Sequence, residues 1–406
     1  GITANCLLLG FFKYANFFVD NANALGEVVT RGWDPIHLEK IFLPLAISFF
    51  TFQQIAYLVD SYRHETREYD LFNYCLFVSF FPQLIAGPIV HHGEMMPQFA
   101  RLRNKVLNWH NVFCGLFVFG IGLVKKVCIA DTFAVWATAG FDQATSLNLF
   151  AAWATSLSYH LQLYFDFSGY TDMAIGSALL FNIRLPLNFN SPYKATSIQD
   201  FWKRWHMTLS RWLRDYIYIP LGGSRHGLRR TCINVFLVFL IGGFWHGAGW
   251  TFIVWGALHG AASAIHRLWK ETGVRLPTWV GWLVTSLFVN ITWVFFRANT
   301  FADAVKVLRG MAGLDGVLLS EKDMKFLYFL KDFGFHFGRV FAEIGGKGHT
   351  ARMIAAFLLI CALAPNSMQL KERIQPRWYW ALATGLLLVY GVLSMNKISE
   401  FLYFQF

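Results

Sequence analysis

The sequence predicts an all-α protein that crosses a membrane several times. Of its 406 residues, 55% are hydrophobic, 18% are aromatic and only 15% are charged, and the mean hydropathy is +0.40. A soluble domain of average composition has about 25% charged residues. The 42 Phe and 16 Trp suit lipid-facing surfaces and interfacial belts. This composition excludes a disordered chain. A secreted disulfide scaffold is also excluded, because 406 residues contain only six cysteines.

Several apolar segments approach the length of about 20 residues that a helix needs to cross a bilayer. In chain order they are residues 2–19, 41–59, 71–90, 112–130, 149–163, 172–181, 233–265, 279–296, 352–364 and 378–393. Some are short or interrupted, so we expect about eight to eleven helices, not all of them full spans. The chain becomes apolar directly after Gly1, without the basic stretch that opens a signal peptide. We therefore expect a single membrane domain over residues 1–406, preceded in the whole protein by further spans.

Two segments do not have the composition of a span. Residues 315–350 are mixed in character and contain glycines, which predicts a loop with an interfacial helix. Residues 181–227 are polar, basic and aromatic together, which predicts a basic interfacial or re-entrant segment within the membrane domain.

One amphipathic helix is predicted within residues 181–227. Thr196 or Ser197 can cap its N-terminus. Gln199 or Asp200 stands three residues further on, which is the arrangement of a capping box. An apolar stripe with helical spacing follows, made of Phe201, Trp205, Leu209, Trp212 and Tyr216. The basic residues largely off that stripe are Lys203, Arg204, Arg211 and Arg214. The glycines at 222–223 end the helix, which lies in the interface either as part of a site or as a peripheral anchor.

The 35 Lys and Arg exceed the 24 Asp and Glu, giving a net charge of +11. Short basic clusters separate the apolar segments, such as Arg101, Arg103 and Lys105, or Arg225, Arg229 and Arg230. Such clusters are typical of the cytoplasmic loops of membrane proteins. No nucleic-acid-binding motif accompanies them, so we expect no nucleic-acid partner. The cysteines lie far apart without a CxxC pair, so no zinc or redox site is predicted.

Ionisable residues inside a membrane cost roughly 2.5–3.5 kcal/mol at its centre, which makes them functional candidates. Asp166 and Asp172 occur in the stretch YFDFSGYTDM. They either pair with basic residues and fix the bundle or take part in function. Lys125 and Lys126 interrupt another apolar run, and the favoured interpretation is that they end a helix at the interface.

Three histidines are further candidates, because neutral imidazole accepts a proton from a hydroxyl near pH 7. His206 stands in WKRWHM and His246 in GGFWHG, where glycines leave little side chain around the imidazole. His259 lies in the same long apolar stretch as His246. Its alternative role is purely structural, as a donor of a hydrogen bond to a backbone carbonyl. GxSxG and P-loop motifs are absent from the sequence, which argues against a hydrolase triad and nucleotide chemistry. No carboxylate or thiolate stands at ligand spacing, so no metal site is predicted.

Seven stretches of the sequence carry a family resemblance. In order they are LPLAISFFTF (43–52), FPQLIAGP (81–88), LYFDFSGYTDMAIG (163–176), NFNSPY (188–193), residues 201–223, GFWHG (243–247) and FLYFQF (401–406). They resemble the membrane-bound O-acyltransferase (MBOAT) family, above all its bacterial polysaccharide branch with the alginate O-acetyltransferase membrane component, and more distantly the D-alanyl transfer proteins for teichoic acid. Several motifs in the correct order over nearly the whole chain make the resemblance far more specific than any one of them.

The resemblance implies a ring of tilted helices around a thinned centre, with re-entrant helices and a tunnel that joins the two membrane faces. It implies that His246 is the essential intramembrane histidine and His206 the second histidine. Basic residues around the 201–216 helix would hold the phosphates of the acyl donor, namely Arg204, Arg211, Arg214 and Arg225. Trp205 and Trp245 are expected beside the substrate. Three residues are expected to support the tunnel, namely Asp166, Asp172 and His259.

The implied function is transfer of an acyl group, expected to be acetyl, toward an extracytoplasmic polysaccharide. The donor would be a cytoplasmic acyl-CoA that acts as a substrate, with no bound cofactor. The expected setting is the bacterial cytoplasmic (inner) membrane, with its lipids and an extracytoplasmic SGNH serine-hydrolase-like acetyltransferase as partners. The alternatives are a transporter or channel, since broken helices and intramembrane His and Asp also mark those proteins, and a structural component of a polysaccharide export complex.

Overall fold

The protein is described by a computed structural model that covers residues 1–66, 70–321, 324–333, 336–395 and 402. Helices dominate these residues, which confirms the predicted all-α class. The exception among them is one short parallel pair of strands, β1 (Leu318–Ser320) with β2 (His336–Gly338). The terminal motif at 401–406 lies outside the described residues apart from Leu402.

The helices range from short turns of four residues to the long helix α8. They are α1 Ile2–Leu9, α2 Ala15–Val29, α3 Ile47–Tyr62, α4 Leu71–Ser79, α5 His92–Ala100, α6 Trp109–Val124, α7 Asp131–Thr138, α8 Leu149–Leu180, α9 Ile198–Trp202, α10 Met207–Leu213, α11 Gly227–His246, α12 Trp250–Glu271, α13 Thr278–Arg297, α14 Phe301–Met311, α15 Met324–Leu327, α16 Gly348–Leu363, α17 Ser367–Arg373 and α18 Trp378–Leu393. Wider turns with π-helical hydrogen bonding interrupt or extend several of them, at Gly10–Tyr14, Lys125–Ala130, Ala139–Gln143 and Arg214–Tyr218.

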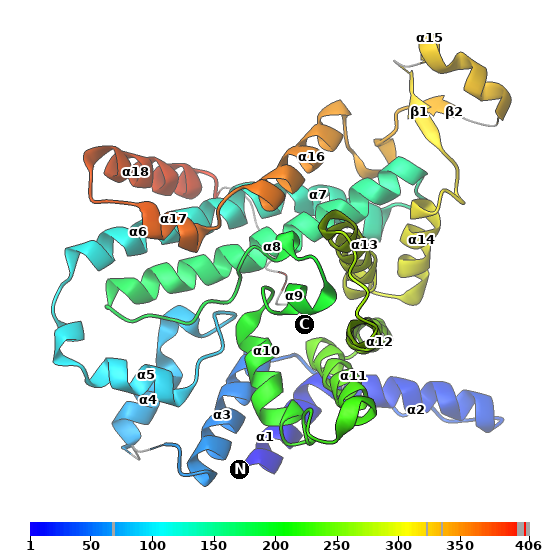
Figure 1. The fold of residues 1–406 in the computed structure, drawn as a ribbon. Helices are drawn as coiled ribbons and strands as arrows, with labels where there is room; N and C mark the ends of the chain where they lie inside the picture. Colours follow the sequence, from blue (N-terminus) through cyan, green and yellow to red (C-terminus); the bar gives the residue numbers. More distant parts are fainter. Residues whose placement is uncertain (67–69, 322–323, 334–335, 396–401, 403–406) are drawn as a thin grey trace.

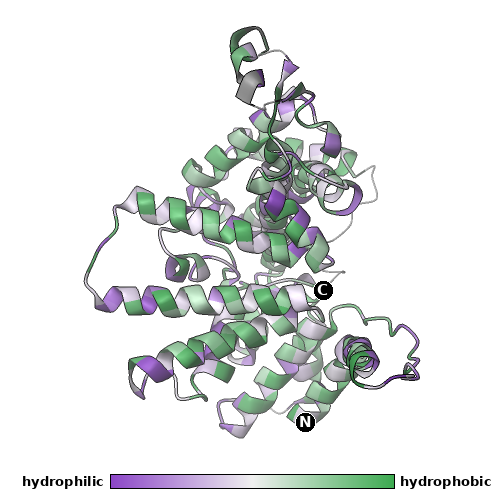
Figure 2. Ribbon diagram, turned by 90° about the vertical axis from the view of Figure 1, so that its right-hand side faces the viewer, coloured by the Kyte–Doolittle hydropathy of each residue, from purple (hydrophilic) through white to green (hydrophobic). Residues whose placement is uncertain are grey.

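Several of these helices have the length and composition of membrane spans. Four qualify within the described residues, namely Ile2–Val29, Trp109–Gln143, Gly227–His246 and Thr278–Arg297. The pair α16 and α17, bent by 57°, passes the same test as a broken span or re-entrant loop. Large apolar side chains project outward, with Phe42 and Phe72 each 84% exposed and Trp378 77% exposed. Figure 2 shows hydrophobic residues along most of the helix lengths, so the protein is a multi-pass membrane protein whose outer surface suits lipid.

Helix α8 runs through the middle of the molecule, and the other helices are arranged around it (Figure 1). It contacts α6, α7, α13, α14 and α16. The sequence predicts two segments here, 149–163 and 172–181, and this prediction is wrong because they form one helix of 32 residues. The polar stretch between them does not break the helix, since Asp166 (1% exposed) and Asp172 (4% exposed) meet cations of a neighbouring helix.

Those cations are Lys125 and Lys126, and the interpretation that they end a helix at the interface is wrong. The helix that begins at Trp109 continues through them in a π-helical turn and runs to Gln143. Lys125 Nζ lies 2.6 Å from Asp172 Oδ2, and Lys126 pairs with both Asp131 and Asp166. A buried charge is tolerated in a span when an opposite charge meets it, which explains why these lysines stay inside.

Two more predicted elements differ from the structure. The segment 71–90 contains the nine-residue helix α4 and one 3-10 turn at Phe81–Gln83, and the chain from Pro82 to Val90 is largely buried without forming a longer helix. Proline at 82 and 88 and the glycine between them prevent a continuous helix there. The segment 233–265 is split at 247–249 into α11 and α12, which pack against each other along their lengths.

Glycines bring α11 and α12 close together. A Cβ atom added to Gly243 would lie 2.9 Å from the Cα atom of Gly256, and one added to Gly260 would lie 3.0 Å from the Cα atom of Phe236. Small residues at such a crossing let two membrane helices approach closely. Gly243, the first residue of GFWHG, therefore serves helix packing, whereas the sequence suggests that the glycines of this motif open the imidazole to substrate.

Candidate active site

His246 is the last residue of α11 and lies in an aromatic pocket. Its imidazole is surrounded by Trp245, Trp255 and Phe296, whose ring centroids lie 4.9, 5.3 and 5.1 Å away. The side chain is buried, and its Nδ1 atom has no hydrogen-bond partner within the described part of the chain. A buried polar atom without a protein partner is costly in an apolar interior unless water or a substrate meets it.

The first span holds the end of α11 in place. Lys13 Nζ donates to the carbonyl oxygens of Trp245 (2.5 Å) and His246 (3.1 Å), and also to Ser48 Oγ (3.2 Å). Tyr14 Oη donates to the carbonyl oxygen of Phe244 at 2.8 Å. The last carbonyls of a helix lack partners within it, so these bonds cap α11 at the residue that carries the imidazole. Sequence reasoning missed Lys13, although a lysine inside the apolar segment 2–19 is the available signal.

We expect Lys13→Met to lower kcat for acyl transfer roughly ten- to a hundredfold, because the last turn of α11 loses its cap and His246 shifts. The KM for the donor should stay near the parental value, since Lys13 contacts backbone rather than substrate in this arrangement. Initial rates at several donor concentrations measure both constants. Lys105→Met, which removes an exposed lysine, is the matched control. Equal kcat values for Lys13→Met and the parent protein would contradict this role.

His206 lies at a break in the predicted 201–216 helix. The structure has α9 and α10 instead of one helix, and His206 between them adopts a left-handed conformation (φ 43°, ψ 54°). Asn188 causes this break, because its carbonyl oxygen accepts from the backbone N–H of Met207 and its Oδ1 accepts from Thr208 Oγ1 at 2.8 Å. The predicted cap is present at the start of α9, where Ser197 Oγ accepts from the backbone N–H of Asp200.

The same asparagine fixes the tautomer of His206. Asn188 Oδ1 also accepts from the backbone N–H of Thr208, which identifies this atom as the oxygen. His206 Nδ1 lies 3.1 Å from it and must therefore donate its proton. The lone pair of a neutral imidazole then resides on Nε2, which is buried and lacks a hydrogen-bond partner within the described residues. His206 consequently presents a hydrogen-bond acceptor, and Asn188 is a second residue that sequence reasoning missed.

His259 differs from the other two histidines. Its Nδ1 accepts from Trp202 Nε1 at 3.2 Å, and its Nε2 lies 3.0 Å from Thr292 Oγ1. Trp202 can only donate, so the proton of the neutral imidazole resides on Nε2 and is given to Thr292. Both nitrogens are therefore occupied, and His259 joins α9, α12 and α13. Phe49 connects His206 with the end of α11, since its ring centroid lies 6.4 Å from that of His206 and 5.7 Å from that of Trp245.

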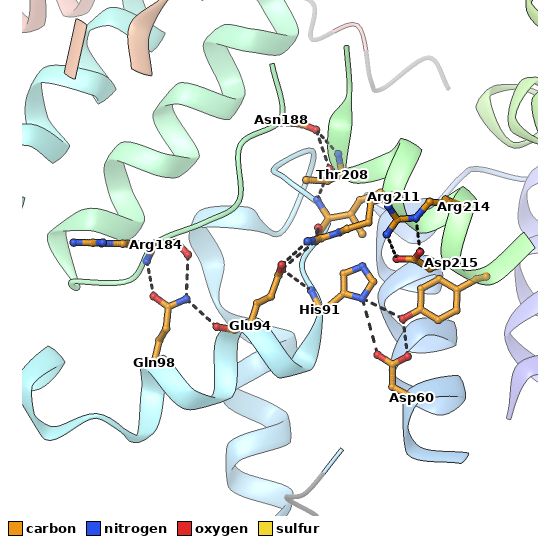
Figure 3. Close-up of polar contacts among 12 residues, drawn as sticks. Asp60, His91, Glu94, Gln98, Arg184, Asn188, Thr208, Arg211, Arg214 and Asp215 are labelled. Carbon is orange, nitrogen blue, oxygen red and sulfur yellow. Dashed lines mark hydrogen bonds and ion pairs between the residues drawn. The ribbon is translucent and has the colours of Figure 1, made fainter. Parts of the chain in front are cut away.

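The three arginines predicted to hold donor phosphates are each paired with a carboxylate of the protein. Arg204 Nε lies 2.9 Å from Asp200 Oδ1 and Arg214 Nε lies 2.7 Å from Asp215 Oδ1. Arg211 makes a two-pronged contact with Glu94 of α5 (Figure 3). Their charges are thus largely balanced within the protein. The fourth candidate, Arg225, is exposed and forms no ion pair among the described residues.

A hydrogen-bonded cluster lies next to Arg211 (Figure 3). Tyr216 Oη donates to Asp60 Oδ1 at 2.7 Å and lies 3.1 Å from His91 Nδ1, which donates to it. Burial and the neighbouring Arg211 guanidinium lower the pKa of His91, so this imidazole is neutral at pH 7. The cluster joins α3, the loop before α5 and the turn after α10.

The two tryptophans expected beside the substrate are core residues. Trp205 is 4% exposed and packs on Phe189 and Trp293, with centroid distances of 5.0 and 5.1 Å. Trp245 is also 4% exposed and stacks on Phe52 at 4.6 Å. Trp245 adjoins His246, whereas Trp205 stands within the aromatic layer between α8 and α13.

Buried polar side-chain atoms without a partner also occur on α8, α12 and α13. Within the described residues they include Ser156 Oγ, Tyr159 Oη, His160 Nδ1, Trp255 Nε1 and both side-chain polar atoms of Asn290. The helices that carry them, α8, α12 and α13, are connected through contacts of α13 with the other two. Polar atoms of this kind are expected to face water or substrate, so they mark a candidate path beside the imidazoles. No three His, Cys, Asp or Glu side chains gather as a metal site in the part of the chain that the structure describes.

Comparison with known proteins identifies the family. Residues 36–302 match the membrane-bound O-acyltransferase family. A peptidoglycan O-acetyltransferase of Helicobacter pylori is 49% identical over 440 aligned positions, which cover 100% of this chain and 81% of that protein. A probable alginate O-acetylase AlgI of Pseudomonas putida is 37% identical and covers 100% of this chain and 83% of its own length. A teichoic acid D-alanyltransferase of Bacillus subtilis is 26% identical over 64% of this chain and 68% of that protein.

The match extends over more than half of the chain. The histidines at 206 and 246 both lie inside the matched region. The chain is an O-acyltransferase, and it belongs to the membrane-bound O-acyltransferase family.

Proposed function

We propose that this enzyme transfers an acetyl group from a cytoplasmic acyl-CoA to a hydroxyl on the extracytoplasmic side of the bacterial inner membrane, for the modification of a cell-envelope polysaccharide. Relatives named for peptidoglycan and for alginate support a polysaccharide as the final acceptor. The acyl-CoA is a substrate, and no bound cofactor is required.

One observation carries the proposed chemistry. His246 is buried with an unpartnered nitrogen at the end of a capped helix, whereas both nitrogens of His259 are occupied. A fixed imidazole with an available lone pair is what general-base catalysis requires, and such a base contributes about 10²–10⁴ in rate. Lys13 and Tyr14 hold the end of the helix that carries this base.

The reaction proceeds by nucleophilic acyl substitution. The acceptor hydroxyl oxygen bonds to the thioester carbonyl carbon while its proton passes to the imidazole of His246. The carbon–sulfur bond then breaks, and the leaving thiolate takes the proton from the imidazolium. The products are an ester and free CoA thiol. His206 Nε2 can accept a second hydrogen bond from the acceptor hydroxyl or a bound water and so orient it.

The basic ends of the helices support the proposed orientation. α11 starts and α12 ends at the same side of their hairpin, where Arg229, Arg230, Arg267 and Lys270 lie. Positively charged loops face the cytoplasm in membrane proteins, which assigns this side to the donor. Asp166 and Asp172 then act as support, because they anchor α8 to the neighbouring span through Lys126 and Lys125.

The acetyl group reaches the polymer through an extracytoplasmic partner of the SGNH serine-hydrolase-like type. A long sugar chain does not fit a narrow intramembrane path, whereas a protein hydroxyl can approach its mouth. Purified enzyme in detergent with acetyl-CoA labelled in its acetyl group tests the proposal. We expect slow release of CoA by the enzyme alone and faster release with partner and polymer present. Efficient acetylation of polymer by the enzyme alone would eliminate the partner, and absence of any acetyl-CoA turnover would refute the function.

A further inference from the structure

A cavity of about 380 Å³ opens between the α9–α10 segment and the α11–α12 hairpin, away from His246. Its lining includes Lys203, His266, Arg267 and Lys270, together with the single acidic residue Glu271. Three of these side chains are permanently cationic, so the cavity carries a net positive charge. Arg267 and Lys270 both lie in the last five residues of α12.

The cations of this cavity are available to a ligand. Within the described ranges, Lys203, Arg267 and Lys270 form no ion pair with a carboxylate of the protein, and Glu271 forms none either. The neighbouring Arg204 differs, because Asp200 pairs with it. Unpaired cations in a concave site are the usual partners of phosphate groups.

An aromatic wall stands beside the charges. Trp202 and Phe239 both line the cavity, and their ring centroids lie 5.0 Å apart. The indole of Trp202 is held in one orientation because its N–H donates to His259. A fixed ring can stack on a flat heterocycle such as adenine. The Gln199 amide in the lining adds a polar group that forms no other side-chain hydrogen bond among the described residues.

The cavity and the pocket of His246 lie at two positions along the same helix, α12, with packed rings between them. Trp202 contacts Trp255 at 5.8 Å between centroids, and Trp255 contacts His246 at 5.3 Å. Trp255 and Arg267 both lie on α12, about 18 Å apart along its axis at 1.5 Å per residue. An acyl-CoA can bridge such a separation, since a long, flexible pantetheine arm joins its phosphates and adenine to the thioester.

We propose that this cavity binds the phosphate groups and the adenine ring of the acyl-CoA donor, with Lys203, Arg267 and Lys270 as the phosphate ligands. This inference rests on the proposed function and replaces Arg204, Arg211 and Arg214 as the phosphate site. An anionic lipid head group shares the phosphate chemistry but has no flat ring to stack on Trp202, and the experiment separates the two ligands.

The test measures binding to the full-length protein in detergent with three probes: free CoA, 3′-phosphoadenosine 5′-phosphate and pantetheine. We expect the first two to compete for one site and pantetheine to compete poorly. Lys203→Gln and Arg267→Gln should each raise the Kd for CoA roughly tenfold, because each removes a charged contact to phosphate. The variants should also raise the KM for acetyl-CoA while leaving kcat and the KM for acetyl-pantetheine unchanged. Arg230→Gln is the matched control, since it removes an exposed charge outside the cavity from the same end of the hairpin.

Each outcome decides the proposal. Parental CoA affinity in Lys203→Gln and Arg267→Gln, with turnover intact, overturns the site while the proposed function stands. If Lys203→Gln and Arg267→Gln weaken binding to phosphatidylglycerol nanodiscs but leave the Kd for CoA unchanged, the cavity binds lipid. That result also overturns the proposed site. CoA binding that depends on these residues in an enzyme that never releases CoA from acetyl-CoA supports the site but refutes the function. If a variant does not elute as folded protein, Lys270→Gln takes its place in the same measurements.

Discussion

His246→Ala should reduce acyl transfer by about 10²–10⁴-fold while leaving the amount of membrane-inserted protein nearly unchanged. The substitution removes the proposed base, whose Nδ1 bonds to no described residue, so no protein hydrogen bond to that atom is lost with it. The backbone carbonyls of the last turn remain available to Lys13 and Tyr14. The measurement is release of CoA from labelled acetyl-CoA, normalised to folded protein.

His259 is the control for this experiment, and His206 is the comparison. His259→Ala should keep the transfer rate of the folded fraction but lower thermal stability by about 1–3 kcal/mol, because Trp202 Nε1 and Thr292 Oγ1 lose their shared partner. His206→Ala should weaken transfer less than His246→Ala does, if its role is to orient the hydroxyl. Parental transfer by His246→Ala would show that the base lies elsewhere.

Asp172→Ala should destabilise the protein by about 3–5 kcal/mol, since it leaves the ammonium of Lys125 buried without a counter-charge. The carboxylate also accepts from Ser367 Oγ at 2.8 Å, so α17 loses an anchor to α8 at the same time. We expect a markedly lower thermal midpoint in detergent. Lys125→Met combined with Asp172→Leu should regain much of the loss, because an apolar pair replaces the charged one.

An exposed ion pair provides the comparison. Arg309 and Asp315 pair at 3.0 Å, but the Arg309 side chain is 54% exposed, so Asp315→Ala should cost less than about 1 kcal/mol. A double variant no more stable than Asp172→Ala would mean that the aspartate acts through something other than Lys125. Equal midpoints for Asp172→Ala and the parent would show that the pair does not hold α8.

The sequence predicts a helix well when the outer face of that helix is apolar along its whole length. Residues 378–393 form α18 with the predicted bounds, and 279–296 differ from α13 (Thr278–Arg297) by one residue at each end. Lipid decides the composition of these helices, so hydropathy alone is sufficient to locate them. The sequence predicts two segments in place of α8, because the polar residues of α8 are paired by a neighbouring helix and no local pattern indicates that pairing.

In the candidate site, too, local sequence identifies some features, whereas others depend on residues far away in the chain. The histidines are identifiable as ionisable residues in apolar surroundings, and the structure separates them by which of their nitrogens have partners. Helical spacing does not predict the break at His206, because the break depends on Asn188, 18 residues earlier, whose carbonyl oxygen binds the backbone N–H of Met207. The pairing of Arg211 with Glu94 joins residues 117 positions apart, so sequence spacing around Arg211 did not indicate that its charge is balanced.

Sided transfer in proteoliposomes tests the central claim most directly. Ser224→Cys, at an exposed position on the proposed cytoplasmic side and in a variant whose native cysteines are replaced by serine, reports the orientation of each preparation through an impermeant thiol reagent. Acetyl-CoA labelled in its acetyl group is supplied outside, with partner and polymer enclosed. The proposal predicts label on the enclosed acceptor and free CoA outside, in proportion to the vesicles whose Ser224 side faces outward, and none with His246→Ala. Label on the acceptor irrespective of orientation, or undiminished with His246→Ala, would contradict it.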